Sequence, residues 1–241
     1  MLPEDGTAQG RLPPPEAPRA KPIRRAAPLP AERGGAHFLK GLSEMYKKQV
    51  TFQKIVCLMT LVVGVLFFIY SLGILTDLFD TLYSMIPNPN NLDSAKVEGA
   101  RIYYDMQPFN RTLLRASIGM ILLSCVLFLT NTHSRRRYYI GNAIATAVNA
   151  AAEAAMAVWC HLQVSAFRNQ YLTTVDFAEL EKRLARRGTY TDSTFWFDIH
   201  YLVCILAVCA AVLLIVNYIW KRKMMQGEQE LLRSSGKAVS A

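Results

Sequence analysis

Three long apolar runs restrict what this chain can fold into more than any other feature of its sequence. Ile55–Leu75, Leu113–Thr130 and Ile199–Trp220 are almost wholly apolar, and each is about as long as a helix that crosses a hydrocarbon core of about 30 Å. Hydrophobic residues make up 52% of the chain and are collected in these blocks, whereas both ends are polar. A soluble single-domain enzyme and a disordered polar chain are therefore excluded.

A fourth segment of membrane length, Tyr138–Val164, is rich in alanine and carries Asn142, Asn149 and Glu153. A carboxyl group at bilayer depth is costly, so we expect neighbouring helices to shield this face from lipid. If the segment were a soluble helix, the chain would have three spans and its tails would lie on opposite sides of the membrane. Four spans are favoured because arginines stand just before and just after the segment.

The sequence thus predicts an all-α integral membrane protein, a four-transmembrane-helix bundle with both termini cytosolic. Within the membrane domain, 55–220, the expected spans are about 55–75, 113–131, 138–164 and 199–220. A disordered Pro-rich N-terminal tail is expected over 1–36, which holds eight of the eleven prolines, and a cytosolic tail over 221–241. Residues 37–54 fit an amphipathic juxtamembrane helix, and the alternative is a simple helical extension of the first span.

The orientation follows from the distribution of lysine and arginine. Residues 1–54 hold 10 of them, the link before the third span holds 3 and residues 221–241 hold 5, whereas the two loops on the other side hold 3 and 5. The positive-inside bias therefore places both termini in the cytosol. Attraction to a bilayer with an anionic inner leaflet explains much of the net charge of +9, so no nucleic-acid partner is expected. The membrane itself is the plasma membrane or the endoplasmic reticulum.

The two loops on the outer side are predicted to form a small cap. In the second loop, Asp176 can cap a short helix with Glu179 in the capping-box position, Glu179 and Arg183 are one turn apart, and Gly188 can end the helix. The apolar face of this helix consists of Phe177, Leu180 and Leu184. We expect the first outer loop, Thr76–Thr112, to cover it.

The polar face of the third span is the most informative candidate site. Asn142, Asn149 and Glu153 are seven and four residues apart, so they share one helical face. Glu153 could bind a proton or a cation in a pathway, or it could be a buried carboxyl that hydrogen-bonds a neighbouring helix or a partner protein. The second interpretation is favoured, because the other spans offer few polar residues for a pathway, namely Thr60, Ser71, Ser117, Ser124 and Asn217.

Two positions are candidates for covalent modification. Cys57, near the cytosolic end of the first span, could accept a palmitoyl group, although a buried small hydrophobe is the simpler interpretation of all five cysteines. Asn110-Arg111-Thr112 is an N-glycosylation sequon on the outer side, close to the second span.

Catalytic and metal-binding patterns are absent from the sequence. The four histidines, at 37, 133, 161 and 200, have no paired spacing, and no phosphate-binding glycine loop or nucleophile with a neighbouring base is present. We therefore expect no enzymatic activity, no metal and no cofactor.

These features favour a non-catalytic accessory or organising subunit of a membrane protein complex. It would use the polar face of the third span and the outer cap to bind membrane protein partners or a second copy of itself. The alternative is a small oligomeric ion or proton channel or transporter that uses Glu153 and Asn149. A protein that modifies or shuttles lipid is a third class, for which the sequence offers no direct support.

Overall fold

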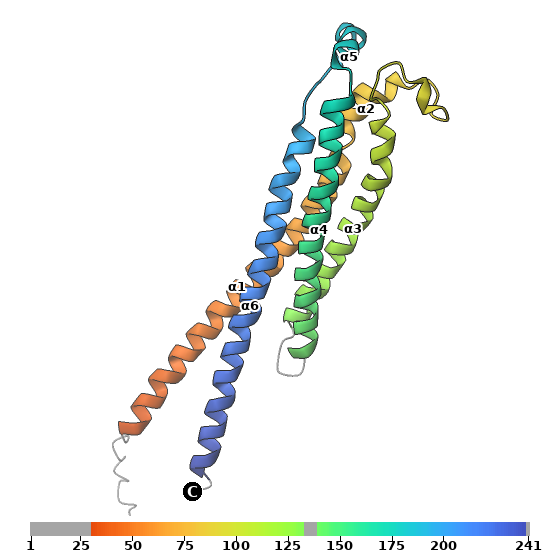
Figure 1. Ribbon diagram of the computed structural model, residues 1–241. Coiled ribbons are helices and arrows are strands. Elements are labelled where there is room, and N and C mark those ends of the chain that lie inside the picture. Colours follow the sequence, from red (N-terminus) through yellow and green to blue (C-terminus); the bar gives the residue numbers. More distant parts are fainter. Residues whose placement is uncertain (1–29, 133–138, 240–241) are drawn as a thin grey trace, which may run out of the picture. The chain divides into compact units, whose positions relative to one another are not determined.

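The computed structural model describes residues 30–132 and 139–239 and contains six α-helices in those ranges (Figure 1). They are α1 (Pro30–Gly73), α2 (Thr76–Leu82), α3 (Ile102–Thr132), α4 (Tyr139–Thr174), α5 (Phe177–Leu184) and α6 (Phe195–Val239). The chain divides into two units, Met1–Leu42 and Ser43–Ala241. The described part of the first unit is the beginning of α1, and the second unit holds the bundle.

Four helical segments are long and apolar enough to cross a membrane: Glu44–Met85, Ile102–Asn131, Ile140–Thr174 and Phe195–Gly227. The alanine-rich segment is one of them, so the prediction of four spans is confirmed in preference to three. The longest helices follow one another in antiparallel order, and we call the two ends of the bundle the link end, where α3 leads to α4, and the loop end, which carries α2 and α5 (Figure 1).

Buried residues recur along each long helix at alternating steps of three and four. On α1 they include Gln49, Gln53, Val56, Thr60, Val63, Phe67 and Tyr70. On α6 they are His200, Val203, Ala207, Ala210, Leu214, Asn217 and Lys221. Such a spacing keeps one seam of each helix facing its neighbours, as in left-handed coiled coils. The opposite faces present large apolar side chains such as Leu58 and Ile205 to lipid.

The cap at the loop end forms largely as the sequence predicts. The Asp176 side chain accepts a hydrogen bond from the Glu179 backbone N–H at 3.0 Å, and Arg183 pairs with Glu179 at 2.8 Å. After α5 a 3-10 turn, Ala185–Arg187, ends at Gly188 in the left-handed conformation. Leu180 and Leu184 are buried in one apolar cluster with residues of the first loop, including Leu82 and Val97.

Some segments have other boundaries than the sequence predicts, and others fall outside the described ranges. The first loop is shorter than expected because α2 occupies its beginning and α3 already starts at Ile102. α1 is continuous from Pro30 to Gly73, so 37–54 continues into the first span, and its location at the headgroups stays a prediction. Residues 1–29 of the predicted tail and Arg135–Arg137 lie outside the described residues.

Candidate functional site

The polar face of α4 lies inside the bundle. Asn142, Asn149 and Glu153 are 2%, 3% and 2% exposed, so the expected shielding from lipid is observed. The side chains lie among this chain's own helices, and their role in binding a partner protein stays a prediction.

The three side chains differ in how their polar atoms are satisfied. The Asn149 amide donates to the backbone carbonyl oxygens of Ala145 at 2.8 Å and Leu123 at 3.2 Å, which ties α4 to α3. Both carboxyl oxygens of Glu153 and the amide oxygen of Asn142 are buried, and none of them has a hydrogen-bond partner among the described residues. A buried polar group without a partner costs about 1–3 kcal/mol, and more when it carries a charge.

A second set of buried amides comes from the other helices and lies at the link end. The Gln49 amide donates to the side-chain oxygens of Gln53 and of Asn217, each at 3.1 Å. The Gln53 amide donates to the backbone carbonyl of Asn131 at 3.2 Å. The bond to Asn217 joins α1 to α6, and the bond to Asn131 joins α1 to α3.

A buried cation and a buried thiol complete this end of the core. The Asn131 amide donates to the Cys57 sulfur at 2.8 Å. Lys221 is 8% exposed, and its Nζ has no partner within the described part of the chain. Cys57 is 2% exposed, so acylation of its sulfur requires the contact between α1 and α3 to open. Palmitoylation at this residue stays a prediction.

The polar interior is therefore built by all four long helices. This differs from the sequence-based expectation that polar lining is confined to the third span. Gln49 and Gln53 lie in the segment expected at the headgroups, while Asn131 and Lys221 lie at or beyond the predicted span ends. The signal that could have revealed them is the three-and-four spacing, which continues past the apolar runs and places all four residues on the buried seams.

The core toward the loop end is mostly apolar by contrast. Beyond Glu153 the buried seams hold Phe67, Leu113 and Met156 among others. Ser117 and Ser124 are buried, but their hydroxyls donate to carbonyls of their own helix. From the link-end amides toward Glu153 the seams first pass through a small apolar cluster, which includes Val56, Leu127, Ala150 and Leu214.

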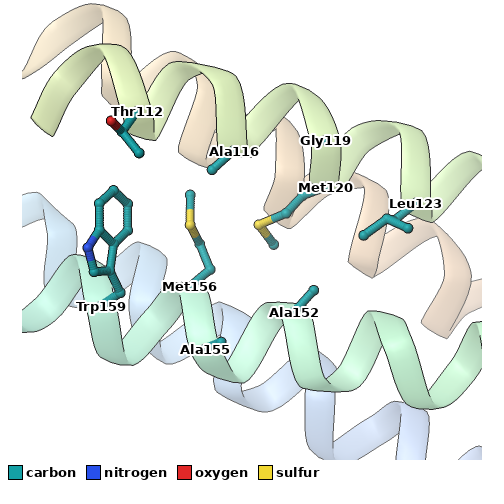
Figure 2. Close-up of a pocket in the computed structure, with 9 residues that line it drawn as sticks. All are labelled: Thr112, Ala116, Gly119, Met120, Leu123, Ala152, Ala155, Met156 and Trp159. Atoms are coloured by element: carbon teal, nitrogen blue, oxygen red, sulfur yellow. The ribbon is translucent and has the colours of Figure 1, made fainter. Parts of the chain in front are cut away.

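A separate apolar groove lies between α3 and α4 on the bundle surface. It has a volume of about 400 Å³. Figure 2 shows its nine lining residues, with Trp159 at one end, Leu123 at the other, and Met120 and Met156 facing each other between them. Small residues, Ala116, Gly119, Ala152 and Ala155, leave the space open. The lining is suited to an apolar chain or helix rather than a polar ligand.

The glycosylation sequon, His161 and His200 lie away from this polar interior. Asn110 lies inside α3 and is half-buried, so its glycosylation stays a prediction. His161 and His200, which the sequence gives no reason to pair, lie in contact across α4 and α6. The described residues contain no group of three or more His, Cys, Asp or Glu side chains arranged to bind a metal.

Comparison with known proteins adds no functional assignment. No family model, no curated protein and no solved structure matches this chain.

Proposed function

We propose that this protein is a small proton transporter in which Glu153 is the proton-binding group. The observation that carries the proposal is the burial of both Glu153 oxygens with no hydrogen-bond partner in the described segments. A carboxyl group held at membrane depth destabilises the bundle, and such groups are typical of ion pathways and proton relays. A structural role would instead need a partner for the carboxyl group.

The polar groups at the link end support a route to Glu153 from one side of the membrane. All four long helices contribute side chains there, among them Gln49, Asn131 and Asn217. The excess of lysine and arginine at the termini and in the α3–α4 link favours a cytosolic link end. In this arrangement Glu153 exchanges its proton with the cytosol, and the apolar half of the core must rearrange before the proton leaves on the other side.

A proton is favoured over a metal cation as the transported species. Hard cations such as Ca²⁺ and Mg²⁺ take about six or more oxygen ligands. Glu153 is the only carboxylate on the buried seam of α4 in the described range, and Asn149 uses its amide nitrogen on backbone carbonyls. A single carboxyl group is sufficient to bind one proton.

The test is proton flux into liposomes that contain the purified full-length chain. With a pH gradient and a compensating potassium potential, the wild-type protein should acidify the lumen faster than empty vesicles do. Glu153→Gln keeps the size of the side chain but cannot release a proton, so its flux should fall to the level of empty vesicles. Glu181→Gln, in the exposed part of α5, is the matched control and should leave flux unchanged.

The second candidate function is that of an accessory subunit, and the groove between α3 and α4 favours it. Its small residues allow close approach of a partner helix. Two results together would support this function. The liposomes would show no proton flux, and the protein extracted in mild detergent would be recovered only in complex with another membrane protein. Flux that survives Glu153→Gln would contradict the proposed role of the carboxyl group.

A further inference from the structure

A pair of histidines lies where α4 packs against α6 near the loop end. His161 Nδ1 and His200 Nε2 are 3.2 Å apart, and the ring centroids are separated by 5.4 Å with an interplanar angle of 20°. His200 is 0% exposed, whereas His161 is exposed on the surface of the bundle. One imidazole is thus fixed inside the core, and its neighbour connects it to the outside of the bundle.

The hydrogen bonds of His200 determine which nitrogen carries a proton. Its Nδ1 contacts the backbone carbonyl oxygen of Phe197. A carbonyl oxygen can only accept, so Nδ1 carries the hydrogen, and Nε2 of the neutral ring is an acceptor. The hydrogen between the two rings must therefore come from Nδ1 of His161, which leaves Nε2 of His161 with a free lone pair in the neutral state.

This arrangement can accept one added proton without losing a contact. A proton on Nε2 of His161 leaves its Nδ1–H donating to His200, and a charged donor strengthens that bond. A second proton would have to sit on Nε2 of His200, where it would face the Nδ1–H of His161. The two N–H groups would then point at each other, and two positively charged imidazolium rings would lie in direct contact.

The groups around the pair are compatible with a single positive charge. The charged groups that act on His200 within the described residues are His161, Asp198 and Arg168. Asp198 is already engaged, since it accepts from Arg168 Nε at 2.9 Å and from the Thr194 hydroxyl at 2.6 Å.

Two further groups lie against the pair. The Tyr201 ring lies 4.0 Å from His200 and 5.5 Å from His161, measured between centroids, and the Ser165 hydroxyl is 3.5 Å from His161 Nδ1. An aromatic face next to imidazolium is favourable. Neither Tyr201 nor Ser165 brings a second cation to the pair.

We propose that His161 and His200 together form a binding site for one proton, held in the hydrogen bond between α4 and α6. This site goes beyond the function proposed for Glu153 and does not depend on it. The two sites are eight residues apart on α4, about 12 Å along the helix axis, with Met156 and Ala157 buried between them.

The proton count is measured by nitrogen NMR of the full-length chain in lipid nanodiscs with ¹⁵N-labelled histidine. Single variants of His37 and His133 identify the signals of the pair. Between about pH 8 and pH 5, where imidazole ordinarily titrates, the pair should take up one proton in total, with His200 keeping its Nδ1–H form. Uptake of two protons, one by each ring, would overturn the proposal, as would a His200 ring that lacks the Nδ1–H form.

A variant at His161 distinguishes proton binding by the pair from a hydrogen bond that only holds α4 and α6 together. Glutamine in His161→Gln can still donate an N–H to His200 but cannot hold the added proton. His200 should then stay in one neutral form throughout the titration. Uptake of a proton by His200 in His161→Gln would contradict the site, and this result is independent of any effect of Glu153 variants on flux.

Discussion

Glu153→Met is expected to make the folded bundle more stable, by about 1–3 kcal/mol in the free energy of unfolding. The substitution keeps an unbranched side chain of similar length and removes two buried oxygens that accept no hydrogen bond from the described residues. Buried ionisable groups can often be replaced by apolar residues with a gain in stability. If Glu153→Met raises the free energy of unfolding and also abolishes proton flux, then the carboxyl group serves the function and lowers the stability of the bundle.

Asn149→Leu is the matched control, one helical turn away on the same buried face. Its amide holds two hydrogen bonds, to Ala145 and Leu123, so its loss should lower the free energy of unfolding by about 1–3 kcal/mol. Both variants can be measured by reversible unfolding of the detergent-solubilised protein in sodium dodecyl sulfate. A Glu153→Met protein that is less stable than wild type would show that the carboxyl group stabilises the bundle, and this would contradict its role as a group that costs stability.

The second large effect is expected at Gly99, where the two connections of the loop end meet. Gly99 has a φ of 77°, and a Cβ there would contact the Thr174 carbonyl and would lie 2.7 Å from Val175 Cα. Next to it, the Asp176 backbone N–H donates to the Glu98 carbonyl at 3.2 Å. Gly99→Ala combines the cost of a left-handed alanine with a backbone collision, so we expect a loss of about 2–5 kcal/mol.

Gly188→Ala isolates the conformational part of that effect. Gly188 has a φ of 68°, but a Cβ there meets nothing within 4 Å. Gly188→Ala should therefore lower the free energy of unfolding by only about 1–2 kcal/mol. Thermal unfolding of the two variants in the same detergent is the measurement. Equal losses at the two glycines would mean that the cap does not pack against the end of α4 as described.

The sequence alone was sufficient to predict the spans and the cap. Membrane spans depend on length and apolar content, which are local properties. The start of α5 depends on Asp176 and Glu179, and the turn after it ends at Gly188, all within one short segment. The burial of Glu153 could also be predicted, because a carboxyl group facing lipid is too costly. These features require no knowledge of which residues meet across the bundle.

The composition of the polar interior could not be predicted in the same way. Gln49 and Asn217 are 168 residues apart, and nothing local to either indicates that they share a hydrogen bond. His161 and His200 appear unrelated in sequence for the same reason, since the antiparallel packing of α4 on α6 brings them together. Predicting such contacts requires the register of the four buried seams, which becomes clear only when the spacing is followed beyond the apolar runs.

If Glu153 binds and releases a proton within the folded protein, infrared spectroscopy should detect that proton on its carboxyl group. Difference spectra of the full-length chain in lipid nanodiscs, recorded between low and high pH, report the carbonyl stretch of protonated carboxyl groups. We expect a carboxyl band that disappears and returns reversibly with pH in the wild type and is missing in Glu153→Gln. A spectrum in which no pH-dependent band is lost with Glu153→Gln, while the protein stays folded, would contradict proton binding by Glu153.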